Sequence, residues 1–290
     1  MTPRTQYSGW MIWAALGILL VVSVPRAALA EYQVIDVENG GTIKGIATWQ
    51  GEIPKVPPLK VLADMDVCGE TVESQALEID PSTKGLRFVL VYLDKVEKGK
   101  APASEYWVHM GRGNRERPGR ACLFQEHVFP FVRTQDVAVV NSDEILHNPH
   151  FYDDKRASLL NVAMPVPNRE VRKKLLRAHG VGLRLVCDVH VHMNAWMAAF
   201  DHPYFAVTDG QGRFEITGVP AGSYTLVAWH EGYNVTTFVS SRPVYDEPHV
   251  RKTSVLVEPG ETLHVLFEFP VRQVTVEWNI AGESGGGSSN

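Results

Sequence analysis

Residues 212–231 read GRFEITGVPAGSYTLVAWHE, and this stretch decides the fold class. Apolar and polar residues alternate around Phe214 and Ile216, which is the period of a half-buried β-strand. The sequence VPAG at residues 219–222 supplies a tight turn, and a second run of aromatic and β-branched residues follows it. The stretch therefore predicts two β-strands joined as a hairpin.

Comparable runs recur along the rest of the chain, bounded by Gly, Pro, Asn and Asp, and they favour an all-β sandwich or barrel. They are residues 41–51, 86–96, 129–143, 180–189, 253–259 and 262–271. Only residues 169–178 have a helical pattern, with Asn168 placed as an N-cap and Gly180 after the last turn. We expect a domain boundary near Asp201, with a first domain over 31–200, a smaller β-sandwich over 201–281 and a flexible tail over 282–290.

Composition and charge limit the classes of protein that this chain can represent. It has 290 residues, of which 44% are hydrophobic and 21% are charged, as in ordinary globular proteins. Its 28 basic and 33 acidic residues give a net charge of −5. A nucleic-acid-binding protein would usually present a basic excess, so we expect no nucleic-acid partner.

The N-terminus has the pattern of a secretory signal peptide. Arg4 precedes the apolar stretch WMIWAALGILLVVSV at residues 10–24, and Ala28-Leu29-Ala30 forms a small-residue cleavage site before Glu31. An uncleaved membrane anchor is the alternative interpretation. We expect cleavage after Ala30, a periplasmic or secreted protein, and no membrane span in the mature chain.

The chain has three cysteines, which should form one pair and leave one thiol in an oxidising compartment. Cys68 and Cys122 lie in loop-like surroundings, whereas Cys187 ends an apolar strand close to several histidines. We therefore expect a Cys68–Cys122 disulfide, although the sequence alone leaves the connectivity open. A metal ion is the usual means by which a free thiol is held in such a compartment.

The segment CDVHVHM brings together side chains that bind copper. Cys187, His190 and Met193 have the spacing Cys-x2-His-x2-Met, and His147 follows the end of an earlier predicted strand. A trigonal site of two histidines and one cysteine, with a distant axial methionine, is the arrangement of blue-copper centres. The sequence predicts one mononuclear copper site with His147, Cys187, His190 and Met193 as ligands.

Around these residues the chain resembles the cupredoxin superfamily, in particular exported plastocyanin-like proteins that continue into a carboxypeptidase-regulatory-like domain. The resemblance is carried by GTIKGIATWQG, CLFQEHVF, NSDEILHNPHF, CDVHVHM and the long segment at residues 202–231. It implies a Greek-key copper sandwich followed by a transthyretin-like one, and it implies the same four ligands. His192 stands where similar loops often carry a tryptophan.

Three further residues are candidates for a role close to the metal. Asn148 directly follows the first ligand, and we expect it to tie the two ligand loops together. His150 is an alternative ligand or a neighbour of the ligands. We expect His192 to be exposed and to titrate near its ordinary pKa of about 6.5, because a residue between two ligands generally points away from the metal.

The predicted function is single-electron transfer by an exported copper protein that is not an enzyme. Its expected partner is a redox protein such as an exported cytochrome or a copper enzyme. Two alternatives are open: copper carriage or storage in the periplasm, and a β-sandwich module for adhesion or assembly that binds no metal.

Overall fold

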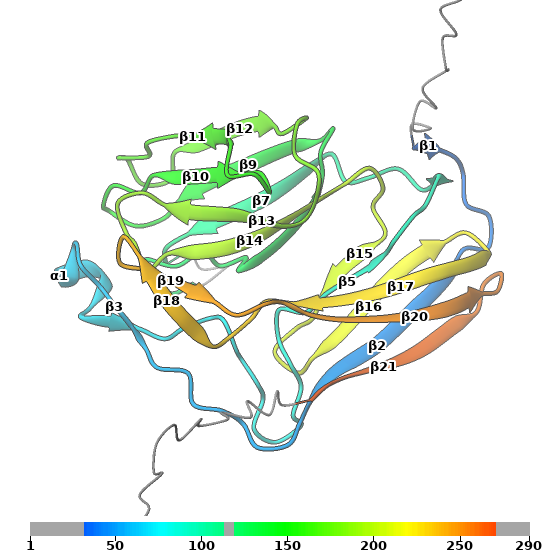
Figure 1. Cartoon of the computed structure of the whole chain (residues 1–290). Helices are drawn as coiled ribbons and strands as arrows, with labels where there is room; N and C mark the ends of the chain where they lie inside the picture. Colours follow the sequence, from blue (N-terminus) through cyan, green and yellow to red (C-terminus); the bar gives the residue numbers. More distant parts are fainter. Residues whose placement is uncertain (1–31, 113–118, 271–290) are drawn as a thin grey trace, which may run out of the picture. The chain divides into compact units, whose positions relative to one another are not determined.

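The computed structural model describes residues 32–112 and 119–270 (Figure 1). The expected signal peptide and the Gly/Ser-rich tail lie outside these residues. The regular secondary structure of the described part of the chain is almost entirely β-strand, with one short helix, so the predicted all-β class is confirmed. In that part, no helix has the length and apolar character needed to cross a membrane.

The first sandwich is built from strands in the middle of the chain. They are β7 (Glu105–Met110), β8 (Val128–Val132), β9 (Asp136–Asn141), β10 (Pro149–Tyr152), β11 (Ser158–Asn161), β12 (Glu170–Lys174), β13 (Gly180–Cys187) and β14 (Asn194–Phe200). A five-stranded sheet has the order β11-β10-β13-β14-β8, and a three-stranded sheet has the order β12-β9-β7. Both sheets contribute to one core, which includes Val139 from β9 and Leu185 from β13.

The second sandwich combines strands from both ends of the described chain. They are β2 (Gly41–Gln50), β5 (Leu90–Leu93), β15 (Phe205–Val207), β16 (Arg213–Val219), β17 (Gly222–His230), β20 (His249–Val257) and β21 (Thr262–Pro270). The sheet orders are β15-β5-β17-β20 and β16-β2-β21, and the two sheets enclose a second core. The β2 strand runs parallel to β21, from Thr42 opposite Thr262 to Gln50 opposite Pro270.

This pairing differs from the expected division into residues 31–200 and 201–281. Strands β2 and β5 precede the first sandwich in sequence, yet each lies in the middle of a sheet of the second sandwich. The predicted turn at residues 219–222 is present, but β16 and β17 on its two sides belong to different sheets. The turn therefore carries the chain from one sheet to the other and does not form a hairpin.

The helix expected over residues 169–178 is wrong. Residues Glu170–Lys174 form β12, which pairs antiparallel with β9. Asn168 has a φ of 57°, whereas an N-cap residue has an extended backbone, and its amide donates to the carbonyl of Asn141 at 2.6 Å. The backbone groups at the edge of β9 thus form hydrogen bonds with this basic segment. The local sequence pattern of residues 169–178 does not reveal this distant partner.

Three small pairs of strands and one short helix complete the described chain. They are the parallel pair β1 (Gln33–Val34) and β6 (Lys98–Gly99), the pair β3 (Leu59–Lys60) and β4 (Thr71–Val72), the hairpin of β18 (Val235–Val239) and β19 (Arg242–Tyr245), and the helix α1 (Met65–Cys68). Two of them, α1 and the β18–β19 hairpin, bring side chains to the candidate site described below.

A buried carboxylate joins strands of the two sandwiches. Glu231, just after β17, accepts a hydrogen bond from the indole of Trp196 on β14 at 2.6 Å and pairs with the ring of His127. Burial alone would raise the pKa of Glu231, but the charge and hydrogen bond of His127 hold it below the usual value. A small apolar cluster that includes Val128 and Trp229 packs beside this network.

Candidate metal centre

The adjacent ends of β10 and β13, two strands of the first sandwich, bring His147, Cys187 and His190 together. In the antiparallel pair of β10 and β13, Pro149 lies opposite Cys187, so His147 reaches the same end of the sheet. The loop after β13 is closed by backbone hydrogen bonds, from the amide of Met193 to the carbonyl of His190 at 2.9 Å and from the amide of Cys187 to the carbonyl of Met193 at 3.2 Å. This closure returns His190 towards the thiol.

Three buried atoms that can bind a soft or borderline metal ion, two imidazole nitrogens and one sulfur, converge at this end of the sheet. The Nδ1 atoms of His147 and His190 are 3.1 Å apart, and they lie 3.9 Å and 3.7 Å from the sulfur of Cys187. All three side chains are almost completely buried. Two imidazoles and a thiol in this arrangement suit copper or zinc, and they fit the trigonal base of a blue-copper site.

Met193, the expected axial ligand, is fully buried in the core that also contains Cys187. Its role as a ligand stays a prediction. Met197, on β14, packs in the same core.

Each histidine is held from its far side by a carboxylate. The Nε2 atom of His147 lies 3.0 Å from Asp143, and the Nε2 atom of His190 lies 3.0 Å from Asp64. An Nε2–H group donating to a carboxylate leaves the Nδ1 lone pair directed at the thiol side, where a metal would bind. Sequence reasoning missed both carboxylates. Asp143 could have been found from its place four residues before His147, whereas nothing in the sequence points to Asp64.

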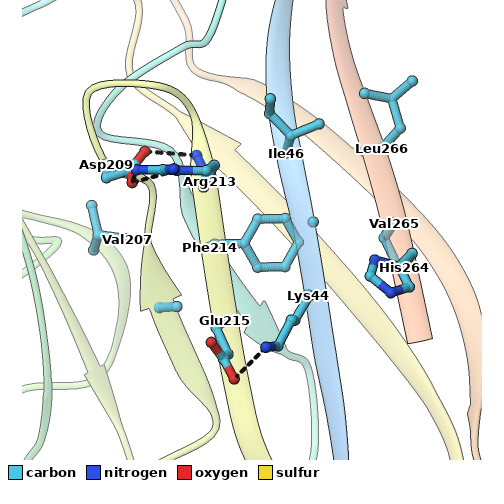
Figure 2. Close-up of a pocket in the computed structure, with 12 residues that line it drawn as sticks. Lys44, Ile46, Val207, Asp209, Arg213, Phe214, Glu215, His264, Val265 and Leu266 are labelled. Atoms are coloured by element: carbon cyan, nitrogen blue, oxygen red, sulfur yellow. Dashed lines mark hydrogen bonds and ion pairs between the residues drawn. The ribbon is translucent and has the colours of Figure 1, made fainter. Parts of the chain in front are cut away.

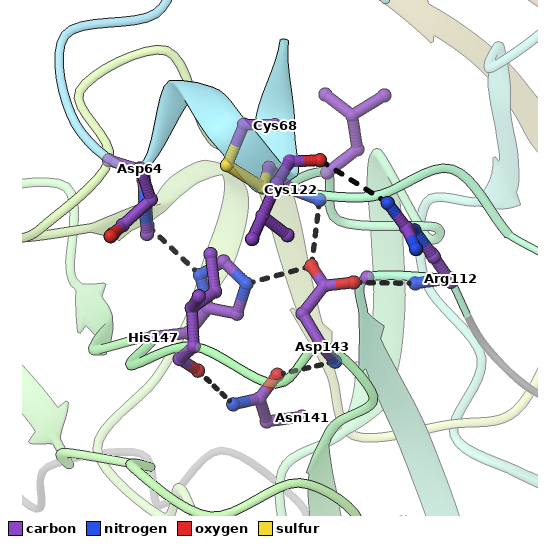
Figure 3. A network of polar contacts seen from close by, with 12 residues as sticks. Asp64, Cys68, Arg112, Cys122, Asn141, Asp143 and His147 are labelled. Atoms are coloured by element: carbon purple, nitrogen blue, oxygen red, sulfur yellow. Dashed lines mark hydrogen bonds and ion pairs between the residues drawn. A yellow bond between two sulfur atoms is a disulfide. The ribbon is translucent and has the colours of Figure 1, made fainter.

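The carboxylate of Asp143 is itself fixed by backbone donors (Figure 3). It accepts hydrogen bonds from the amides of Cys122 at 2.8 Å and Arg112 at 3.1 Å, and its own amide donates to the side chain of Asn141. Burial would raise the pKa of Asp143, but the hydrogen bond to His147 and these amides lower it overall. The side chain is therefore ionised and oriented before any metal binds.

The predicted disulfide between Cys68 and Cys122 is present and lies beside both carboxylates (Figure 3). Asp64 has a φ of 51°, and its backbone carbonyl accepts hydrogen bonds from the amides of Val67 and Cys68 in the single turn of α1. Its carboxylate makes no capping bond and instead reaches His190. The disulfide thus connects the turn that carries Asp64 to the loop whose amide binds Asp143, and Cys187 is the free thiol.

Hydrogen bonds stabilise the thiolate form of Cys187. The backbone amides of Asn148 and His190 lie 3.3 Å and 3.5 Å from its sulfur. Burial would raise the pKa of Cys187, but hydrogen bonds with both histidines and these two amides lower it to about 6. The expected link through Asn148 is thus made by its backbone, whose carbonyl also accepts the amide of Asp188 at 3.0 Å.

The thiolate and Asp143 act in turn on His147. Burial would lower the pKa of this histidine, but hydrogen bonds to Asp143 and Cys187 raise it to about 9. Without a metal, the site at neutral pH therefore holds an imidazolium beside a thiolate.

The expectation that His192 is exposed is wrong. Its side chain is 2% exposed, and its Nε2 atom lies 3.2 Å from the carbonyl oxygen of Cys122. Burial, followed by the charge of His190, lowers the pKa of His192 to about 4, so the ring is neutral at physiological pH. It packs beside the disulfide-bonded loop, a contact that sequence spacing does not reveal.

His150 lies outside the group of converging donors. Its Nδ1 atom is 2.8 Å from the carboxylate of Asp188, and its Nε2 atom is 3.0 Å from the hydroxyl of Ser158. Both ring nitrogens have partners on the surface of the sheet, which leaves none directed at the thiol.

The loop after β13, which carries His190, is also held by a residue from outside the first sandwich. Arg242, at the start of β19, donates to the carbonyl oxygens of Cys187 at 2.5 Å and Val191 at 3.3 Å. These bonds fix the backbone on both sides of His190 without contacting the donor atoms.

Comparisons with known proteins cover parts of the chain. A family model described as polysaccharide lyase family 4, domain II, matches residues 189–265, which span several strands of the second sandwich. This is a different family from the carboxypeptidase-regulatory-like one that we expected there. No curated protein matches the chain.

Several solved structures of cupredoxins are similar to part of the chain. A purple cupredoxin from Nitrosopumilus maritimus has 16% identity and a TM-score of 0.27, over 33% of this chain and 99% of that protein. Pseudoazurin from Hyphomicrobium denitrificans has 19% identity and a TM-score of 0.26, over 33% of this chain and 74% of that protein. A reduced amicyanin variant has 13% identity and a TM-score of 0.26, over 34% and 86% of the two chains.

Proposed function

We propose that this protein is an exported mononuclear copper protein of the blue-copper type that transfers single electrons. The convergence of two imidazole Nδ1 atoms and one thiol sulfur in a buried space carries this proposal. His147, Cys187 and His190 would hold the ion, and Met193 would be the weak axial ligand. Bound there, copper would supply reversible one-electron chemistry.

The surrounding residues suit electron transfer because they fix the ligands before the metal binds. Asp143 and Asp64 set the tautomer and orientation of the two imidazoles, and the amides of Asn148 and His190 donate towards the sulfur. Little movement of the ligands is then needed when the charge of the site changes. Hydrogen bonds to the sulfur also draw electron density from it, which favours the reduced state.

Export is the second part of the proposal. The Cys68–Cys122 disulfide suits an oxidising compartment, in agreement with the signal-peptide pattern at the N-terminus. We propose a periplasmic or secreted protein without enzymatic activity, whose partner is an exported cytochrome or copper enzyme. The second sandwich, proposed as a carboxypeptidase-regulatory-like module, would contribute support through the hairpin that carries Arg242.

The test is the visible spectrum of the purified protein after addition of Cu(II). We expect one copper ion per chain and an intense absorption from sulfur-to-copper charge transfer, which Cys187→Ser should abolish. The Cys187→Ser variant removes only the thiolate and leaves the disulfide intact. A weakly coloured site that prefers Cu(I) would support carriage or storage instead. A protein that retains no copper would support the metal-free module.

A further inference from the structure

A pocket that is rich in arginine lies beside the loop that carries Cys187 and His190. It is a cavity of about 400 Å³ lined by Arg156, Arg184 and Arg242, together with side chains of β10, β13, β14 and β19. Among the described residues that line it, Asp188 is the only acidic one. The pocket therefore brings three permanently charged guanidinium groups to one small volume.

These positive charges are poorly compensated within the described chain. The guanidinium groups of Arg156 and Arg184 make no hydrogen bond or ion pair with any residue of the described ranges 32–112 and 119–270. Arg242 donates only to backbone carbonyl groups, and the nearby charges of Asp188 and Cys187 attract it without a hydrogen bond. Asp188 already accepts hydrogen bonds from His150 and Asn161.

The acid behind the pocket does not neutralise the cluster either. Glu231 attracts Arg184, but its carboxylate oxygens are bonded to His127 and Trp196. Burial lowers the pKa of Arg184, and repulsion from Arg156 and Arg242 acts in the same direction. Arg184 nevertheless keeps its charge, because the ordinary pKa of a guanidinium lies far above neutral pH.

Another groove on the molecule shows the usual arrangement of surface charges. In the groove over β16, β2 and β21, Lys44 pairs with Glu215 at 3.2 Å, and Arg213 pairs with Asp209 at 2.8 Å (Figure 2). Its cations are thus satisfied by neighbouring carboxylates. The arginine pocket differs because, among the residues that the structure describes, the guanidinium groups of Arg156 and Arg184 have no carboxylate bonded to them.

The remaining walls of the pocket are aromatic and apolar. The guanidinium of Arg184 stacks over the ring of Trp196, with 4.1 Å from its central carbon to the ring centre. Val244 and Tyr245 line the pocket from β19, the strand that also carries Arg242, and Val239, at 60% exposure, lines it from β18. A ligand here would meet both guanidinium groups and apolar side chains.

We propose that this pocket binds a small organic oxyanion, with a carboxylate or phosphate head between the guanidinium groups and an aromatic or aliphatic body against Trp196 and Tyr245. Planar guanidinium groups bind such heads through paired hydrogen bonds. A cavity of about 400 Å³ is in the range of small-molecule sites. The proposal does not depend on a metal, because no residue of the pocket is one of the predicted ligands.

The experiment is titration calorimetry of the metal-free full chain in a low-salt buffer, with benzoate, phenyl phosphate, inorganic phosphate and phenol as probes. We expect benzoate or phenyl phosphate to bind, and their order shows which head group is preferred. Inorganic phosphate should bind more weakly because it lacks the apolar body, and phenol should not bind because it is neutral.

Arg156→Gln and Lys155→Gln form a matched pair, since the two residues are adjacent and only Arg156 lines the pocket. Arg156→Gln should weaken binding about tenfold, the effect of losing one charge-assisted hydrogen bond, whereas Lys155→Gln should bind like the parent chain. Val239→Asp, which adds a negative charge at an exposed position of the pocket, should weaken binding as well. Equal affinities of the first two variants, or no binding of either aromatic anion to the parent chain, would overturn the proposal.

Discussion

At the scale of single residues, the unusual feature of the site is that each histidine has its own carboxylate. Asp143 is buried and held by backbone amides, whereas the side chain of Asp64 is 40% exposed. The Asp64 contact is therefore the one that a conservative substitution can test without disturbing the core.

Asp64→Asn should lower the copper affinity of the protein about tenfold, at the lower end of the effects seen when a carboxylate beyond a ligand is lost. Asparagine tolerates the left-handed backbone of this position and can still accept a hydrogen bond, but it carries no charge. Asp66→Asn, in the same turn, is the matched control. Competition with a chelator of known affinity measures the effect, and equal affinities of the two variants would show that Asp64 does not support His190.

The titration of His147 and Cys187 predicts how many protons copper uptake releases. The raised pKa of His147, about 9, leaves it protonated at pH 7.5, whereas the lowered pKa of Cys187, about 6, leaves it a thiolate. Between these two values His147 should therefore release about one proton when copper binds. Below about pH 6 Cys187 should release a second one, and above about pH 9 neither residue should release any.

Calorimetric titration with copper in buffers of different ionisation enthalpy measures this release. The Cys187→Ser variant should lose the additional release at low pH. A proton count that stays constant from pH 5 to pH 10 would contradict the assignment of these two groups.

The sequence predicts the converging ligands but not the groups around them. His147, Cys187 and His190 stand at strand ends and in a short loop, so spacing alone indicates their common target. Asp64 comes from a segment more than a hundred residues earlier, and the burial of His192 depends on the loop that carries Cys122. Such contacts arise from tertiary packing, which local patterns do not encode.

At the scale of elements, the disulfide links the helix α1 to the loop before β8. Removing it in the double variant Cys68→Ala/Cys122→Ala should lower the free energy of unfolding by about 2–4 kcal/mol, since it closes a loop with a sequence separation of 54. The same variant should bind copper more weakly, because α1 positions Asp64 and the amide of Cys122 positions Asp143.

Chemical denaturation of the metal-free protein and chelator competition measure the two effects separately. A double variant in alanine avoids the unpaired thiol that a single substitution would leave. Loss of stability without any loss of copper affinity would show that the disulfide acts on the fold alone.

Strand patterns are predicted better than strand partners. Alternation identifies β2, β5, β13, β16, β17 and β21 within their predicted ranges. It does not show that β2 pairs with β21, or that β12 completes an edge next to β9 in a segment with helical composition. Pairing is decided by distant backbone donors and acceptors, so a sequence boundary drawn at residue 201 separates strands that belong together.

At the scale of the whole molecule, the second sandwich should be unable to form from the C-terminal part alone. A fragment of residues 201–270 lacks β2, which lies between β16 and β21, and β5, which lies between β15 and β17. We expect this fragment to lack cooperative unfolding, whereas residues 32–270 should unfold in a cooperative transition. Circular dichroism during thermal unfolding distinguishes the two, and a sharp transition in the short fragment would contradict the observed topology.

The parallel pairing of β2 with β21 also has a consequence for how the protein acquires its structure. These strands are the first and last long strands described, and the whole first sandwich is inserted between β5 and β15. Pairs so distant in sequence require a large loop to close, and folding slows as such contacts come to dominate. During synthesis, all strands of the inserted sandwich have emerged before β21, the partner of β2, has been made. The sandwich that begins first therefore folds last, and its unpaired strand edges are the part of the nascent chain that is most exposed to aggregation.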